Sequence, residues 1–355
     1  MNCIFFNHPI KLITGGHKYN HALLSYLQKD SGTTVITTPR CSEIYPGWRK
    51  IYAPFSELKR IKRVGCHDVV FFGDTCFKYH LLLLLILRIL RRGIPIVIVH
   101  HFSYLNDHGI VRYVNYMWQY VFYVLCKYII VPSPYTRRIA EEHFKKKKVV
   151  YIPLPFHHDY CPSAYYEEGN FLYVGTIEPR KGLIYLMEAL GIVKQQKPDW
   201  HFTLNIVGEM VDRHYADQII SKAEELNIKE HIIMRGRVSD DELNDCYQRA
   251  EMFTFPSLLE GYGIVLIEAF SKGVPVICFN NSAMPYTVKD GINGLVADNM
   301  DAQSLADKIM LLSGNKTLRE KLQKGIVKTI EGLKTKEDFE AGIRNMFYTI
   351  KQAIG

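Results

Sequence analysis

Two glutamates, Glu260 and Glu268, lie in the segment EGYGIVLIE with seven residues between them. Glu260 opens a glycine-rich turn, in which successive backbone N–H groups can form an anion-binding concavity. We expect Glu268 two turns into the following helix, beside the apolar run 264–267. A carboxylate in apolar surroundings needs hydrogen-bond partners, and the vicinal hydroxyls of a sugar would supply them. The alternative is an ordinary helix glutamate paired with a nearby lysine.

A pair of adjacent cations, Arg180 and Lys181, lies upstream in the segment VGTIEPRKG. It follows a predicted strand and directly precedes a predicted helix. Arginine binds phosphate through forked hydrogen bonds and lysine acts as a point charge, so the pair suits a diphosphate. The plainer interpretation is a solvated charged loop.

A glycine pair, Gly15 and Gly16, precedes a predicted helix over 17–27 in the first half. Glycines at such a point let backbone N–H groups approach a phosphate, and the helix terminus adds partial positive charge. On its own such a pair is more often an ordinary turn. The GxGxxG fingerprint is absent from the sequence, which argues against an NAD enzyme.

The spacing of the cysteines and histidines does not indicate a metal site or a redox dithiol. No two of the eight cysteines are closer than ten positions, so neither a CxxC metal site nor a redox dithiol is present. The adjacent histidines His100 and His101 have no cysteine or carboxylate spacing that would complete a metal site. We therefore expect no metal and no resident cofactor.

The elements that position these residues follow an alternating pattern. Short β-branched runs alternate with helical stretches in both halves, which is typical of α/β domains with parallel sheets. We expect strands at 34–37, 69–72, 96–99, 129–131, 171–174, 203–207, 232–235, 252–255 and 274–279. In the second half we expect helices at 185–197, 217–226, 240–250 and 264–272. Such sheets bind ligands beyond the carboxyl ends of their strands, which is where the glutamate and cation loops begin.

A chain of 355 residues is long enough for two domains. Three prolines, paired histidines and paired acidic residues interrupt the alternation within 149–170, so we place the linker there. We expect an N-terminal domain over 1–155, a linker over 156–169 and a C-terminal domain over 170–335. A final helix over 336–355 is expected to pack back on the N-terminal domain.

The first half is basic and rich in tyrosine. Residues 1–170 carry 22 Lys and Arg against 11 Asp and Glu, and 16 of the 23 tyrosines. This indicates an anionic partner, and no nucleic-acid-binding module is recognisable. The apolar run 81–87 is too short to span a bilayer, which takes roughly 20 residues. Together with the arginines that follow it and the aromatic span 111–128, it is either a buried core helix or a face that meets an anionic membrane surface.

These segments together resemble glycosyltransferase family 4, a retaining family with the GT-B fold. The resemblance is strong in the second half, in FLYVGTIEPRKGLIYLMEAL, LNIVGEM, IIMRGRVSDDELNDCYQRA, FPSLLEGYGIVLIEAFSKGVPVI and DGINGLVA. It is looser in the first half, in ITGG, IPIVIVHH and YIIVPSPYT. The resemblance implies two Rossmann-like α/β domains facing across a central cleft, with the acceptor on the first domain and a nucleotide-sugar donor on the second.

The resemblance also implies roles for particular residues. Arg180 and Lys181 would hold the donor diphosphate, Glu260 the transferred sugar and Glu268 the nucleotide ribose. Further donor contacts would come from Gly15, Gly16, Val238, Gly261, Tyr262, Gly263 and Ile264. His100 would line the reaction centre, with His101 as the alternative. The sequence departs from the family at Thr176, where arginine is frequent, and at Tyr286, where glutamate is common.

The function so implied is transfer of a hexosyl group from a UDP- or GDP-sugar to a hydroxyl of a glycan or lipid-linked acceptor. The product would be an α-glycosidic bond in a surface polysaccharide, a lipopolysaccharide or a glycolipid. We expect a metal-independent cytoplasmic enzyme, with peripheral attachment to the inner face of the membrane as an option. The alternatives are a catalytically silent nucleotide-sugar-binding subunit and a nucleotide-sugar epimerase on the same fold.

Overall fold

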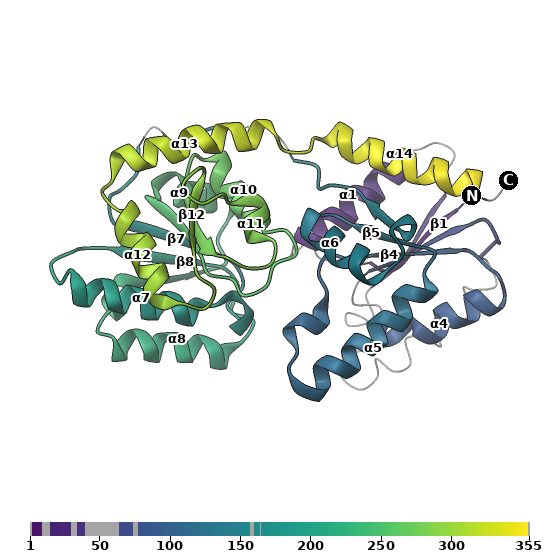
Figure 1. The fold of residues 1–355 in the computed structure, drawn as a ribbon, viewed down its shortest axis with the longest axis horizontal. Coiled ribbons are helices and arrows are strands. Elements are labelled where there is room, and N and C mark those ends of the chain that lie inside the picture. Colours follow the sequence, from purple (N-terminus) through teal and green to yellow (C-terminus); the bar gives the residue numbers. More distant parts are fainter. Residues whose placement is uncertain are drawn as a thin grey trace. The chain divides into compact units, whose positions relative to one another are not determined.

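The computed structural model describes residues 2–8, 15–29, 34–39, 64–73, 77–156, 160–163 and 165–353. The chain divides into two compact units, each with its own parallel sheet (Figure 1). The first unit combines Met1–Phe156 with Lys334–Gly355, and the second is His157–Leu333.

The sheet of the first unit has the strand order β2-β1-β3-β4-β5-β6, with every pair parallel. Helices lie on both of its faces, so its central strands are apolar throughout rather than alternating. The strands are β1 Cys3–His8, β2 Val35–Pro39, β3 Val69–Gly73, β4 Ile94–Ile98, β5 Tyr128–Val131 and β6 Val149–Tyr151.

Two helices, α4 Phe77–Ile89 and α5 Gly109–Leu125, lie on one face of this sheet (Figure 1). On the other face lie α1 Gly15–Lys29 and α14 Lys336–Gln352, whereas α6 Pro134–His143 ends against α5, where the rings of Tyr120 and Phe144 stack with 5.5 Å between centroids. Short 3-10 turns occur at Ser103–Asn106 and Lys146–Lys148. Among the described helices, none combines the length and the hydropathy that crossing a bilayer requires.

The C-terminal helix α14 packs into the core of the first unit. The ring of Phe339 meets that of Tyr19 edge to face, with 5.6 Å between centroids. Tyr19 in turn donates a hydrogen bond to the carbonyl of Ile152 at 3.0 Å, and Gly342 lies against the side chain of Ile152. Residues separated by more than 300 positions thus share one core.

The sheet of the second unit has the strand order β12-β11-β10-β7-β8-β9, again parallel throughout. The strands are β7 Asn170–Val174, β8 Thr203–Val207, β9 Ile232–Gly236, β10 Met252–Phe255, β11 Val276–Phe279 and β12 Gly294–Ala297. The helices are α7 Leu183–Gln196, α8 Arg213–Glu225, α9 Asp240–Arg249, α10 Ile264–Ser271, α11 Met284–Thr287, α12 Ala302–Leu312 and α13 Lys316–Glu331. Short 3-10 turns occur at Pro179–Lys181 and Lys229–His231.

The predicted strands and helices are confirmed to within a few residues at their ends, and the expected pair of Rossmann-like α/β units is present. Three strands were not predicted: β1, β6 and β12. The three residues of β6 lie at the end of the range 1–155 expected for the first domain, just before the linker expected over 156–169. Strand β12 begins with glycine, a residue that ordinarily argues against a strand. At Gly294 a Cβ atom would lie 2.5 Å from the carbonyl oxygen of Val276, so the close strand approach there requires glycine.

We predict that α14 is an integral part of the first unit. Phe339 and Ile343 are fully buried, so Phe339→Ala should cost about 3–5 kcal/mol of unfolding free energy and Ile343→Ala about 2–5 kcal/mol. Tyr348→Ala, at an exposed position of the same helix, should cost no more than about 0.5 kcal/mol. Denaturant titration measures the free energy of unfolding of each variant. Hydrogen-exchange protection of β5 and β6 then shows whether the loss of stability falls in the first unit. Equal effects of the buried and exposed variants would contradict the packing.

Candidate functional site

Three loops meet at the carboxyl edge of the sheet of the second unit. Residues 175–182 follow β7, residues 256–263 follow β10 and residues 280–283 follow β11. The chain proceeds from β7 outward to β8 and β9, and then returns to place β10 on the other side of β7. The boundary between β7 and β10 is therefore the topological switch point, where open α/β sheets bind their ligands.

Backbone contacts fasten these loops to one another. The N–H of Leu258 donates to the carbonyl of Arg180 at 2.8 Å, and the Arg180 guanidinium donates to the carbonyl of Leu259 at 2.8 Å. Gly182 has φ +67°, and a Cβ atom there would lie 2.1 Å from the carbonyl oxygen of Pro256. Only glycine fits this close approach in this backbone conformation. The close approach brings the cation loop against the glutamate loop.

A buried ion cluster forms where the two loops meet. Oε1 of Glu260 accepts hydrogen bonds from the Lys181 ammonium, from Nη1 of Arg180 at 3.2 Å and from the Ser257 hydroxyl at 3.0 Å. The side chains of Lys181 and Glu260 are only 11% and 13% exposed. Burial opposes ionisation of Glu260, but the Lys181 and Arg180 charges outweigh it and hold the pKa of Glu260 below its usual value. The glutamate is therefore a carboxylate at neutral pH.

A second carboxylate holds Arg180 from its other side. Nη2 of Arg180 donates to Oε1 of Glu178 at 2.7 Å, and Thr176 donates its hydroxyl proton to the same oxygen at 2.7 Å. Although burial opposes the arginine's charge, Glu260 and Glu178 together raise the pKa of Arg180 above its ordinary value. Thr176, which stands where the family often has arginine, thus orients Glu178 and through it Arg180.

Glu268 lies in α10, the helix that follows the glutamate loop, one turn after its start at Ile264 rather than the expected two turns. The hydroxyl of Tyr247, on α9, donates to Oε2 of Glu268 at 3.3 Å. Burial is the main cause that raises the pKa of Tyr247 well above its usual value, and the nearby Glu268 carboxylate is the second cause. The phenol therefore remains a hydrogen-bond donor. Helix α10 begins after Gly263, which has φ +80° and no side chain to cap the helix. Because α10 follows the loop after β10, its N-terminus and its uncapped N–H groups lie at the same edge of the sheet as the ion cluster.

The remaining candidates in the second unit are arranged around this edge. Gly261 and Tyr262 lie in the glutamate loop, and Ile264 is the first residue of α10. Val238 is half-buried in the connection between β9 and α9. The structure brings Arg180, Lys181 and Glu260 into direct contact, and it shows no such contact between Val238 and that cluster.

The candidates of the first unit form a separate group. Gly15 and Gly16 begin α1, and His100 follows the carboxyl end of β4. A Cβ atom at Gly16 would lie 3.0 Å from the His100 imidazole, so the two residues are in close contact. Nε2 of His100 is 2.9 Å from Oδ1 of Asn20, one turn further along α1. His101 is half-buried beside it.

Four residues of the site escaped the sequence analysis, which noted Thr176 only as a departure from the family: Glu178, Ser257, Ser282 and Asn20. The spacing of Ser257 and Glu260, three positions apart, is a pattern in which a hydroxyl can meet a carboxylate, and it could have been noticed. Ser282 accepts a hydrogen bond from the N–H of Glu260 at 3.0 Å, in a left-handed conformation with φ +47°. Nothing in the local sequence indicates that contact, because it spans two loops.

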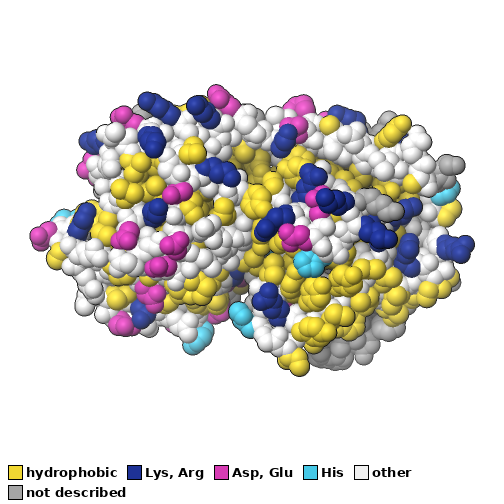
Figure 2. All heavy atoms as spheres, viewed as in Figure 1, with side chains coloured by type: hydrophobic (Ala, Val, Ile, Leu, Met, Phe, Trp, Pro, Cys, Tyr) yellow, Lys and Arg dark blue, Asp and Glu magenta, His cyan; other side chains and the backbone are white. Residues whose placement is uncertain are grey.

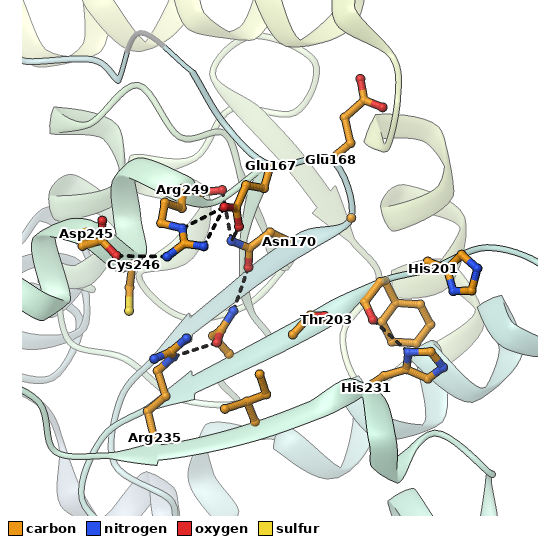
Figure 3. Close-up of a pocket in the computed structure, with 14 residues that line it drawn as sticks. Glu167, Glu168, Asn170, His201, Thr203, His231, Arg235, Asp245, Cys246 and Arg249 are labelled. Atoms are coloured by element: carbon orange, nitrogen blue, oxygen red, sulfur yellow. Dashed lines mark hydrogen bonds and ion pairs between the residues drawn. The ribbon is translucent and has the colours of Figure 1, made fainter.

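A cavity of about 450 Å³ lies elsewhere in the second unit, toward the amino ends of β7 and β8 (Figure 3). None of its described lining residues is a predicted site residue. Its polar side chains pair with one another in a chain: Arg235 donates to Asn205 at 2.7 Å, Asn205 to Asn170 at 2.7 Å, and Asn170 to Glu167 at 3.0 Å.

Glu167 ends this chain in an ion pair with Arg249, at 2.6 and 2.9 Å (Figure 3). The pairing fastens the segment that precedes β7 to helix α9. We therefore assign the polar network of this cavity a structural role. Among the described residues, no group of three or more His, Cys, Asp or Glu is arranged to hold a metal ion.

Two family models match this chain, one on each half. The family model Glycosyltransferase Family 4 matches residues 8–160, and the model Glycosyl transferases group 1 matches residues 164–328. O-antigen chain mannosyltransferase B of Escherichia coli is 30% identical over 199 residues, which are 52% of this chain and 51% of that protein. The chain thus spans about half the length of this relative.

Solved structures share the whole fold at low sequence identity. Sucrose-phosphate synthase from Thermosynechococcus elongatus superposes with a TM-score of 0.77 over 99% of both chains, at 17% identity. HepE from Anabaena, in complex with UDP and glucose, superposes with a TM-score of 0.76 over 98% of this chain and 100% of its own, at 14% identity. With one family model on each half and GT-B structures matching from end to end, this chain belongs to glycosyltransferase family 4.

Proposed function

We propose that this protein transfers a hexosyl group from a UDP- or GDP-sugar to a hydroxyl of a glycan or lipid-linked acceptor, with retention at the anomeric carbon. The observation that carries the proposal is the ion cluster of Arg180, Lys181 and Glu260 at the switch point of the second unit. Phosphate-binding cations and a sugar-binding carboxylate there adjoin one another, as the diphosphate and the sugar of a nucleotide-sugar require.

The cations act on the leaving group. In the transfer step the bond from the anomeric carbon to the phosphate oxygen breaks, and a bond to the acceptor oxygen forms on the same face. The acceptor's proton leaves with the departing diphosphate or passes to solvent. Negative charge builds on the phosphate as the sugar becomes oxocarbenium-like, so fixed positive charges stabilise the transition state more than the ground state. Arg180 and Lys181 supply those charges, and no metal has to supply them.

Glu260 serves the sugar and keeps the cations in place. Its carboxylate is ionised and buried, so sugar hydroxyls that donate to it meet a strong acceptor. Because Lys181 and Arg180 are held on one oxygen of Glu260, the diphosphate and the sugar bind to a single rigid cluster. Pre-organisation of this kind is what makes electrostatic stabilisation effective.

Glu268 is assigned to the nucleotide ribose. Tyr247 orients its carboxylate, and the uncapped start of α10 offers N–H groups one turn away. A carboxylate accepting from two vicinal hydroxyls fixes the ribose, while the helix N-terminus favours the adjoining phosphate. The backbone of Gly261, Tyr262, Gly263 and Ile264 completes this donor site, with Val238 toward the base.

The first unit is assigned to the acceptor. Gly15 and Gly16, which are assigned to the donor phosphates, present the N-terminus of α1, and the contact with His100 fixes the imidazole beside it. His100 would line the reaction centre from this unit. The name of the Escherichia coli relative supports a product in lipopolysaccharide or a similar surface glycan, and HepE was solved with UDP and glucose.

Donor binding is tested by thermal stabilisation with a panel of nucleotides and nucleotide-sugars, without added metal. A ligand present at 100 times its dissociation constant adds about 2.7 kcal/mol to the free energy of unfolding. We expect a shift with UDP or GDP species that is lost in Glu268→Ala. The control is Glu320→Ala, at an exposed position of α13. An undiminished shift in Glu268→Ala would remove the ribose assignment.

The catalytic role of the cluster is tested by comparing a variant that loses one charge with a variant that loses both. Lys181→Ala should lower turnover on the order of 100-fold or more, as loss of one oxyanion donor does. It also leaves Glu260 with fewer partners in a buried position, which lowers stability. Lys181→Met combined with Glu260→Gln removes both charges and should recover stability without recovering turnover. Near-normal turnover in the double variant would show that the pair is only structural.

The products distinguish the proposed reaction from its alternatives. Nuclear magnetic resonance of the purified product should show a new α-glycosidic linkage and a released nucleoside diphosphate. An epimerised nucleotide-sugar, or no product with any donor that binds, would contradict the proposal. Arg249→Gln, in the Glu167 network away from the site, is the matched control and should leave the kcat unchanged.

A further inference from the structure

Helix α5 has its apolar residues on the side that faces outward. Of its 17 residues only Arg112 is charged, and the helix contains no Asp or Glu. Its side toward the protein core is made by Gln119, Phe122 and Tyr123. The exposed apolar residues are Ile110, Val111, Tyr113, Val114, Met117, Trp118, Tyr120, Val121 and Val124. Positions 110, 114, 117, 121 and 124 recur at helical spacing and form one continuous stripe.

Helix α4 packs beside α5 and adds further exposed apolar residues to this stripe. Leu83, Leu84 and Leu87 are fully buried, whereas Leu82 is exposed on the outer side of α4, and Ile89 and Leu90 are exposed at its end. The run 81–87 is therefore partly a core helix and partly surface. Figure 2 shows apolar side chains gathered over this region of the first unit. A contiguous exposed apolar area of this kind on a protein surface marks an interaction site. We call these exposed residues of α4 and α5 the α4–α5 face.

Basic residues border the α4–α5 face. Arg88 and Arg91 are exposed at the end of α4, and Lys127 is exposed just after α5. The Lys148 ammonium donates to the carbonyl of Val124 at 3.2 Å, which places this charge at the C-terminal end of the stripe. Helix α4, like α5, contains no Asp or Glu. The border is thus positively charged at the C-terminal ends of the two helices, whereas Asp107 accepts a hydrogen bond from Asn115 near the start of α5.

We propose that the α4–α5 face docks on the surface of an anionic lipid bilayer. An apolar stripe with tyrosine and tryptophan, bordered by lysine and arginine, matches the layered chemistry of acyl chains beneath phosphate headgroups. Trp118 and Tyr113 have the amphipathic rings that favour the interface. Since no described helix can span a bilayer, the face lies on the membrane rather than in it. A second copy of the chain fits less well, because its basic border would meet an identical one.

The docking deepens the proposed function, because a transferase held at a bilayer meets a lipid-linked acceptor at high effective concentration. Docking itself needs no transfer reaction and no nucleotide. The two proposals therefore fail separately: vesicle binding tests this one, and nucleotide stabilisation of the second unit tests the other.

Vesicle flotation measures the docking directly. The protein should float with vesicles of phosphatidylcholine mixed with phosphatidylglycerol, and Trp118→Glu/Val121→Glu should weaken that binding on the order of tenfold or more. The matched control is Tyr348→Glu/Val211→Glu, which places the same charges at exposed apolar positions on α14 and in the second unit. Equal loss in both double variants, or no flotation of the unaltered protein, would overturn the proposal.

The charge of the border is tested separately. Arg88→Gln/Lys127→Gln should lower affinity for the anionic vesicles about tenfold and leave affinity for phosphatidylcholine alone unchanged. The control Lys321→Gln/Lys351→Gln removes exposed charges from α13 and α14 and should change neither. Sedimentation velocity identifies the competing occupant. A dimer that Trp118→Glu/Val121→Glu dissociates, together with unchanged vesicle binding, would assign the face to a second copy instead.

Discussion

The site depends on one buried charge arrangement, in which Glu260 is held as a carboxylate by Lys181 and Arg180. Two loops that are 79 positions apart along the chain must lie in contact for it to form. Removing charges from water is expensive, so such a cluster persists only when each member is paired and hydrogen-bonded. Ser257, Ser282 and Glu178 complete that pairing. The tight backbone approach at Gly182 is the geometric condition, since it closes the space between the loops.

The sheet topology explains why the cluster stands where it does. Strand β7 lies at the centre of its sheet, with the chain leaving it on one side and returning on the other. The helices that follow β7 and β10 therefore lie on opposite faces of the sheet, and the carboxyl edge between them is where such sheets bind ligands. The cavity near Arg235 lies away from that edge, and its polar groups are paired with one another. A cavity alone is thus a poor guide to the site.

Sequence patterns predicted the α/β alternation, most strands and the residues of the charge cluster, because these are local signals. They could not predict that Lys181 touches Glu260, since that contact depends on the order of strands in the sheet. Strand β6 is three residues long and shows no periodicity, and the glycine that opens β12 argues against a strand. Because the run 81–87 is apolar throughout, its sequence could not show which side chains are buried. The packing of the unit places Leu84 in the core and Leu82 on the surface.

The most direct measurement is the structure of the second unit's donor complex, obtained by crystallising the full chain with a nucleoside diphosphate. The account predicts phosphate oxygens about 3 Å from the Arg180 guanidinium and the Lys181 ammonium, with the ribose hydroxyls at Glu268. It also predicts that Glu260 keeps its contact with Lys181. A diphosphate bound instead in the cavity beside Arg235, with the ion cluster unoccupied, would contradict the account.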